Sequence, residues 1–401
     1  MPPIYLDYNA TTPIAREVAD AMTPYLYEHF GNPSSPYAYG VATKQAVEAA
    51  RAQVAGLMGS DPSEIIFTSC ATESNNYAIK GVALAGREKG NHMITSAVEH
   101  PAVVEVCRWL EGQGFRITVL PVDHYGLVDP ADLERAITPE TLLVTVMHAN
   151  NEVGTIQPVA ELAAIAHRHG ALMHTDAAQS LGKIPVNVEA LGVDLLSVAG
   201  HKLYAPKGIG VLYVRSGVTL APLIHGAGQE GGRRPGTENV LLVVGLGRAC
   251  AIAGRDLDDN VAHFKSMRDR LHEGLVRALG EEAVRLNGPP EKRLPNTLNV
   301  SFLYVEGESL MMGCSDVAVS SGSACTSASL EPSYVLKGLG LGDDLAHSSI
   351  RYSLGRFTTE EDIDYAIKQV IEAVNHLRNM SPLYEMAQEG IDLSTVQWQS
   401  H

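Results

Sequence analysis

Short apolar runs alternate with amphipathic stretches through the middle of the chain. Seven runs of four to seven mostly apolar residues predict strands at 65–68, 92–95, 117–121, 142–148, 171–176, 195–199 and 210–214. Between them apolar residues recur at helical spacing, for example over 74–84, 101–112 and 159–168. Short buried strands separated by helices are typical of an α/β fold with a mostly parallel sheet that helices cover on both faces.

The pattern changes near residue 257. A long polar helix is predicted over 260–279, followed by a strand at 299–302 and a helix at 359–377. We therefore expect a large α/β domain over residues 14–257 and a smaller α+β domain formed by residues 1–13 and 258–401. Open parallel sheets bind ligands beyond the carboxyl ends of their strands, so the functional site should lie there.

A glycine-rich segment, VVGLGRACAIAG at 243–254, imitates a dinucleotide-binding fingerprint. Cys250 occupies the third glycine position, and the acidic residue that should end a strand about twenty residues later is missing. The segment therefore predicts a packed helix instead of a nucleotide-binding turn.

Charge and composition exclude several functional classes. The formal net charge of −16 argues against a nucleic-acid-binding protein, which needs clustered Lys and Arg. No run of eighteen apolar residues occurs, so no membrane span is expected, and the first residues lack the pattern of a signal peptide. Five cysteines without a CxxC pair indicate reduced thiols, and we expect a cytoplasmic protein.

A lysine and an acid follow two of the predicted strands. Lys202, in AGHKLYAPKG, comes directly after the strand at 195–199, where its amine could form a Schiff base with an aldehyde cofactor. Asp176 ends the strand at 171–176 and could keep a pyridine nitrogen protonated, and Gln179 could donate to a phenolic oxygen. The alternatives are a surface lysine and an N-cap at Asp176 for a helix beginning near Ala177.

Other polar residues near strand ends suit a phosphorylated cofactor and a small substrate. FTSCATESNN runs from a strand into a helix whose free N–H groups could bind phosphate, although Thr72 could instead simply cap that helix. His201 could reach the same phosphate, and His100 could stack on the cofactor ring unless it is only structural. Asn151 lies just past a strand, and Arg351 could clamp a carboxylate or form an ordinary ion pair.

Cys325 lies in SSGSACTSASLEP, among small hydroxylated residues instead of the apolar neighbours that a structural cysteine usually has. This composition predicts a solvated loop, about 320–332, on which a thiol can ionise and react. A lone loop cysteine can also be incidental, and the Lys202 motif is what favours the reactive interpretation.

Together these motifs, with YLDYNATTP, ANNEVGT, HTDAAQ, GRRPGTEN and AHSSIRYSLGRFTTEEDIDY, resemble those of the cysteine desulfurases. These are pyridoxal phosphate enzymes of the class V aminotransferase group with the type I fold. The long cysteine loop and the tail at 381–401 resemble the iron–sulfur cluster assembly branch, whereas CATE, EHPAV and GRRPGTEN are closer to the nitrogen-fixation desulfurase.

The resemblance implies a role for each motif residue. Lys202 would be the Schiff-base lysine, Cys325 the persulfide-forming nucleophile and His100 the ring-stacking acid–base. Contacts to pyridoxal phosphate would come from Ala71, Thr72, Asn151, Asp176, Gln179, Ala199, His201 and Thr237, and substrate contacts from Asn151 and Arg351. Thr237 would reach the cofactor of a second subunit, which implies a homodimer, and Cys325 could also act as a transient iron–sulfur cluster ligand.

The implied reaction converts L-cysteine to L-alanine and passes the sulfur, as a persulfide, to iron–sulfur cluster assembly and to tRNA thiolation. The tail at 381–401 would dock the scaffold protein and other acceptors. Three positions depart from the family pattern: Ala199 replaces a serine that touches the phosphate, Tyr37 replaces a histidine, and Pro235 replaces a small residue.

Two other functions remain open on the sequence. A selenocysteine lyase or small-amino-acid aminotransferase of the same fold would use Lys202 but not Cys325. A scaffold-only subunit would keep the fold without the chemistry, and the complete set of Lys202, Asp176 and His100 argues against it.

Overall fold

The large domain is built on a seven-stranded sheet. The computed structural model describes residues 3–321 and 332–390. The sheet has the order β2-β8-β7-β6-β5-β3-β4, and only β8 runs antiparallel to its neighbours. The mostly parallel sheet predicted from the sequence is confirmed by the strands β2 (Ile65–Thr68), β3 (His92–Ser96), β4 (Arg116–Leu120), β5 (Thr141–Thr145), β6 (Leu172–Asp176), β7 (Leu195–Ala199) and β8 (Gly210–Val214).

Alternate side chains of these strands enter two separate cores, as the period of two in a strand requires. Ile65, Phe67 and Val144 pack in one core, beneath α3 (Ala38–Met58), α7 (Val159–Arg168) and α9 (Val240–Arg255). Ile66 and Leu143 point to the opposite face, beneath α4 (Ala71–Gly86) and α5 (Pro101–Glu111). Both faces are therefore buried, which explains why the strands read as continuous apolar runs.

The smaller unit contains its own sheet and core. The sheet has the order β12-β13-β10-β9, and a short parallel pair joins β1 to β11. Its core combines Leu6 with residues between Met267 and Val374. Its elements are β1 (Ile4–Tyr5), α10 (Leu257–Leu279), β9 (Val284–Leu286), β10 (Thr297–Phe302), α11 (Gly307–Gly313), β11 (Val317–Ala318), β12 (Ser320–Ser321), α12 (Tyr334–Gly338), α13 (Asp343–His347), β13 (Ser349–Ser353), α14 (Glu360–Asn379) and α15 (Pro382–Gln388). The expected domain limits at 13 and 257 stay predictions.

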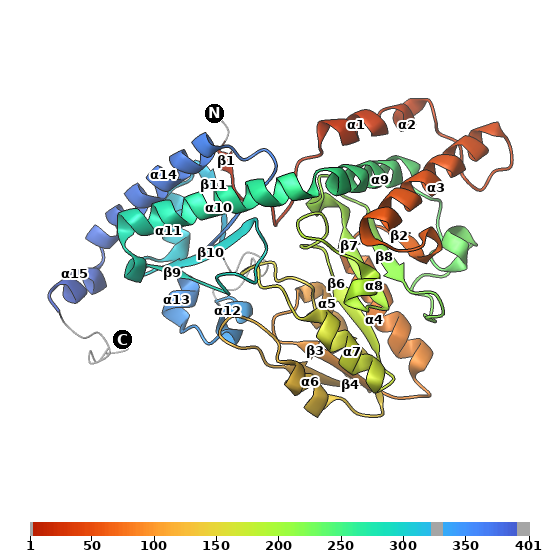
Figure 1. Cartoon of the computed structure of the whole chain (residues 1–401), viewed down its shortest axis with the longest axis horizontal. Coiled ribbons are helices and arrows are strands. Elements are labelled where there is room, and N and C mark those ends of the chain that lie inside the picture. The colour runs from red at the N-terminus through yellow and green to blue at the C-terminus, as the bar shows by residue number, and fades with distance from the viewer. Residues whose placement is uncertain (1–2, 322–331, 391–401) are drawn as a thin grey trace.

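The remaining helices lie around the large sheet: α1 (Arg16–Met22), α2 (Pro24–Tyr27), α6 (Pro130–Ala136) and α8 (Val188–Leu191). Figure 1 shows α9 and α10 running end to end across the upper half of the molecule, with α1 and α2 above α9 on one side and α15 at the far end of the other side. Among the described helices, none combines the length and apolarity that a bilayer crossing requires.

The glycine-rich segment at 243–254 lies within α9, so the packed-helix prediction is confirmed. A Cβ added at Gly247 would lie 2.6 Å from the Cα of Ala50 in α3. Only glycine permits this close approach of the two helices. The glycine spacing thus serves helix packing, not nucleotide binding.

A buried ion pair fixes the segment that precedes Thr237 to the large domain. Arg51 of α3 donates to both carboxylate oxygens of Glu230, over 2.8 and 2.9 Å, and to the carbonyl of Ile65 over 2.9 Å. Glu230 also accepts the backbone N–H of Phe67 over 3.0 Å. The side chains are only 10% and 3% exposed, so each charge depends on the other for compensation.

We expect Glu230→Ala to lower the free energy of unfolding by about 3–5 kcal/mol, because it removes the buried counter-charge of the Arg51 guanidinium and leaves only the exposed Glu48. Glu48 also pairs with Arg51 but is 55% exposed, so Glu48→Ala is the matched control and should cost less than about 1 kcal/mol. Urea unfolding followed by circular dichroism measures both values. Equal losses for the two variants would contradict this account of the buried pair.

Candidate active site

A cavity of about 490 Å³ lies where the carboxyl ends of the large sheet meet β12 and β13 of the smaller unit. Because β8 is antiparallel to both β2 and β7, the strands β2, β3, β5, β6 and β7 all end at this edge. The cavity brings together ten residues predicted from the sequence, namely Ala71, Thr72, His100, Asn151, Asp176, Gln179, Ala199, His201, Lys202 and Arg351.

For different reasons, the structure does not place the two other predicted site residues, Thr237 and Cys325, in the lining of this cavity. Thr237 is exposed on the segment held by Glu230 and does not line it. Cys325, with the loop at 322–331, lies outside the described residues, as does the tail from 391 onward. Among the described residues, no cluster of His, Cys, Asp or Glu is placed to hold a metal ion.

Lys202 and Asp176 enter the cavity from neighbouring strands. Lys202 lies in a short helical turn directly after β7, and Asp176 is the last residue of β6. One Asp176 oxygen accepts the Asn75 amide over 2.7 Å, and the other accepts the N–H of Ala178 over 2.9 Å. Residues 178–180 form a turn, so the alternative in which Asp176 caps a helix is wrong.

His100 caps α5 and lines the cavity. Its Nδ1 accepts the N–H of Ala102 over 3.1 Å, which places the ring proton on Nε2 in the neutral form. Burial lowers the pKa of His100, Asp176 opposes this effect, and Lys202 adds to it. The ring is therefore neutral near pH 7, with Nε2–H as its remaining donor.

The N-terminus of α4 forms an anion site at one end of the cavity. The helix begins at Ala71 with Cys70 as its N-cap, so the alternative in which Thr72 caps it is wrong. Within the described part of the chain, the Cys70 side chain does not cap the helix, so first-turn N–H groups remain for a ligand. A Cβ on Gly210 would lie 2.6 Å from the Cys70 carbonyl carbon, so this turn requires glycine in the adjacent strand β8.

His201 lies beside this anion site, and its Nδ1 is 3.1 Å from the Thr11 hydroxyl. Burial lowers the pKa of His201 to about 4, and Lys202, Lys207 and Lys183 add to the effect. His201 is therefore a neutral hydrogen-bonding group near pH 7, not a cation.

Arg351 already has an acidic partner. Its Nη2 is 2.7 Å from Asp7 Oδ1, and its Nη1 donates to the Asn151 carbonyl over 3.1 Å. The ion-pair alternative for Arg351 is thus confirmed, and it does not exclude substrate binding. The buried Nε has no hydrogen-bond partner among the described residues, so one donor remains at the cavity wall.

Sequence reasoning missed three polar residues that line this cavity, Asp7, Asn9 and Asn75, and the buried Lys183 outside its lining. Asp7 and Asn9 occur in the motif YLDYNATTP but lie more than 280 residues from their partners Arg351 and Thr297. Asn75 follows Ala71 by one helical turn, and this spacing could have placed both on the same face of α4. No pattern in the sequence indicates that Lys183 is buried.

The residues of the cavity fit pyridoxal phosphate. An amine for the aldehyde, a buried carboxylate for the pyridine nitrogen and a helix N-terminus for the phosphate occur in one space. The Asn75 Oδ1 is buried without a partner among the described residues, so a polar group remains to be satisfied beside Asp176.

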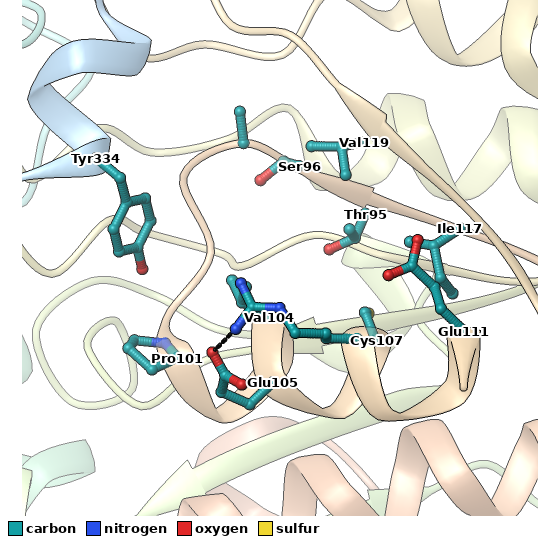
Figure 2. A pocket seen from close by; sticks show the side chains of 12 residues that line it. Thr95, Ser96, Pro101, Val104, Glu105, Cys107, Glu111, Ile117, Val119 and Tyr334 are labelled. Carbon is teal, nitrogen blue, oxygen red and sulfur yellow. Dashed lines mark hydrogen bonds and ion pairs between the residues drawn. The ribbon is translucent and has the colours of Figure 1, made fainter. Parts of the chain in front are cut away.

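A second cavity, of about 510 Å³, lies along α5 (Figure 2) and holds none of the predicted site residues. Figure 2 shows α5 side chains along its floor and Tyr334 at one end. Cys107 lines it, and burial raises the pKa of this thiol to about 12, which makes it a poor nucleophile. Of the predicted site residues that the structure describes, all except Thr237 line the first cavity.

Comparisons with known proteins agree with this geometry. The profile of the Aminotransferase class-V family matches residues 4–366. The chain is 51% identical to a human cysteine desulfurase, over its whole length and 88% of the relative. It is 51% identical to the cysteine desulfurase IscS of Anaeromyxobacter dehalogenans, over 99% of this chain and 98% of the relative.

A solved structure of a NifS-like protein superposes with a TM-score of 0.87 at 39% identity, covering 93% of this chain and all of the other. This match confirms the predicted type I fold of pyridoxal phosphate enzymes. The chain belongs to the class-V aminotransferase family and, within it, to the pyridoxal phosphate-dependent cysteine desulfurases.

Proposed function

We propose that this cysteine desulfurase removes the sulfur of L-cysteine as a persulfide on Cys325 and releases L-alanine. The observation that carries the proposal is the convergence of Lys202, Asp176 and His100 on one cavity beside the helix N-terminus of α4. Bound pyridoxal phosphate would supply the electron sink for the charge left at the substrate α-carbon.

Side chains of the cavity would bind the cofactor and transfer the protons. Lys202 would hold the cofactor through its amine and, once displaced by substrate, take the α-proton. The Asp176 carboxylate, fixed by Asn75 and Ala178, would keep the pyridine nitrogen protonated. His100 would present Nε2–H to the reacting group while its Nδ1 stays bonded to the helix.

Arg351 and Asn151 would orient the substrate carboxylate at the cavity wall. The Cys325 thiolate would then attack the substrate sulfur, so that an S–S bond forms as the C–S bond breaks and the carbon fragment is protonated to alanine. Three other thiols are poor candidates, because burial raises the pKa of Cys107 and Cys250 to about 12 and that of Cys314 to about 11. Cys70 lines the cavity and is the alternative nucleophile within the described residues.

Mass spectrometry of the protein after incubation with L-cysteine tests this proposal. We expect one added sulfur atom on the peptide that contains Cys325, and no addition in Cys325→Ala or Lys202→Ala. Cys70→Ala is the matched control and should still acquire the sulfur. A persulfide on Cys70, or cysteine turnover that survives Cys325→Ala, would refute the assignment and favour the alternative nucleophile or a related lyase.

Ala199 offers a second test, on cofactor affinity. It lines the cavity and is only 3% exposed, and its methyl group cannot donate to a phosphate. We expect Ala199→Ser to slow the loss of pyridoxal phosphate during dialysis, because a hydrogen bond to a charged group contributes about 1.5–3 kcal/mol. Unchanged or faster loss would show that the α4 amides and His201 already satisfy the phosphate.

We further propose that the protein acts in the cytoplasm and passes its sulfur to a scaffold protein of iron–sulfur cluster assembly and to tRNA thiolation. The tail at 381–401 would provide the docking segment. Its described part, α15, packs Tyr384 against Tyr304, with ring centroids 5.6 Å apart, at the extremity of the smaller unit (Figure 1).

A homodimer is the proposed assembly, and an exposed apolar cluster supports it. Large apolar side chains that are 60–71% exposed occur together on α2 and around the start of α3, namely Leu26, Tyr27, Phe30, Tyr37 and Tyr39. Tyr37, which departs from the family pattern, belongs to this apolar cluster. Exposed apolar groups in this number usually mark an interface, and in such a dimer the exposed Thr237 would reach the partner's cavity.

We expect the double substitution of Phe30 and Tyr39 by Glu to shift the protein from dimer to monomer in sedimentation velocity, because charges would replace apolar contacts. Met312 is 81% exposed on α11, outside this cluster, so Met312→Glu is the matched control and should stay dimeric. The monomer should also bind pyridoxal phosphate more weakly, because it lacks the partner's Thr237. A wild-type protein that sediments as a monomer would refute the proposal.

A further inference from the structure

Lys183 is a buried lysine behind the cofactor cavity. It lies in the turn that follows β6, is only 4% exposed and does not line the cavity. Its Nζ donates to Gln179 Oε1 over 2.9 Å and to Asn9 Oδ1 over 3.4 Å. Within the described part of the chain it forms no ion pair with a carboxylate, so both acceptors are neutral amides.

The surroundings of Lys183 disfavour its charge. Burial lowers the pKa of the Lys183 amine well below its usual range, and the nearby cations Lys202 and Arg351 lower it further. A buried amine of this kind costs folding free energy that an apolar side chain of the same length would not. Fold stability therefore does not explain why a lysine occupies position 183, next to the cofactor cavity.

The amine fixes the orientation of the Gln179 amide. Its Nζ–H donates to Oε1, so the oxygen of the Gln179 amide is turned toward Lys183 and its nitrogen is turned away. On the other side, Nε2 donates to the carbonyl of Asn9 over 3.0 Å. Nε2 carries a second hydrogen, and Gln179 lines the cavity, so the amide presents a donor there.

We propose that Lys183 is a positioning residue for the cofactor: it holds Gln179 so that the amide presents N–H, not C=O, to the phenolic oxygen of pyridoxal phosphate. The inference rests on the proposed role of Gln179 in the cofactor site. Without Lys183, Oε1 would be buried with no donor, and the side chain would rotate toward other donors of the cavity, such as Lys202.

The contacts of Asn9 show that removal of the Lys183 amine would leave only Gln179 without a donor. Asn9 Oδ1 also accepts the Asn296 amide over 3.0 Å, so it keeps a donor when Lys183 is removed. Gln179 Oε1 accepts from Lys183 alone among the described residues. Lys183→Met therefore leaves one group unsatisfied, and that group belongs to the residue whose orientation is in question.

The test uses the full-length protein and added pyridoxal phosphate. In Lys183→Met we expect the Kd for the cofactor to rise about threefold to tenfold, from one lost hydrogen bond. The pH midpoint of the bound cofactor's visible absorbance should move up by about one unit, because a donor that stabilises the phenolate is lost. The melting temperature of the cofactor-free protein should stay the same or rise.

Three further variants separate positioning from a structural role. Lys183→Arg keeps a donor and should restore the absorbance midpoint. Lys207→Met removes an exposed positive charge from the same neighbourhood and should leave the midpoint unchanged. In a Gln179→Leu background, Lys183→Met should change cofactor affinity less than twofold, since its effect acts through Gln179.

An unchanged midpoint in Lys183→Met, or a variant that fails to fold, would overturn the inference, because Lys183 would then serve stability alone. An effect of full size in the Gln179→Leu background would overturn it as well. A wild-type protein that takes up no pyridoxal phosphate would instead refute the proposed cofactor site, so the two failures are distinguishable.

Discussion

The hydrogen bonds of Asn9 are the constraint on which the site depends. Its amide nitrogen donates to the Asn151 carbonyl of the large domain and to the Thr297 hydroxyl of β10. Its backbone N–H donates to the Ser353 hydroxyl of β13 over 2.9 Å. Asn9 thus joins residues of the large domain to both central strands of the smaller sheet, and a buried amide left without these partners would destabilise the fold.

The cavity places cationic groups and a helix N-terminus in a chain that is acidic as a whole. The chain has a formal net charge of −16, and in the cavity Lys202 and Arg351 are accompanied by the carboxylates of Asp7 and Asp176, so the N-terminus of α4 is the part that favours an anion. Low pKa values keep His100 and His201 neutral, so they add donors without adding charge. This arrangement suits a phosphorylated cofactor and a substrate carboxylate, and it concentrates the attraction for anions at one place.

Much of this architecture could be predicted from the sequence, because local patterns determine it. The strands β2, β7 and β8 and the helix α7 begin and end where the apolar pattern predicts, and parallel strands necessarily bring Asp176, Lys202 and Ala71 to one edge. The strand β5 ends at Thr145, three residues before its predicted end, although the N–H groups of Val146 and His148 still donate to carbonyls of β6. The contact of Asp7 with Arg351 spans 344 residues, and no periodicity predicts such a pairing.

The end-to-end arrangement of α9 and α10 has a mechanical consequence (Figure 1). The two helices meet at Asp256, and the 23 residues of α10 then run along the smaller unit, a length of about 34 Å at the usual rise per residue. At this length, a rotation of α10 by about 5° around Asp256 would displace the far end of the helix by about 3 Å. A displacement of that size is enough to break a hydrogen bond. A small rotation at Asp256 would therefore be amplified at the far end of the smaller unit, and the hydrogen bonds that Asn9 and Arg351 form with the Asn151 carbonyl are among the contacts that oppose it.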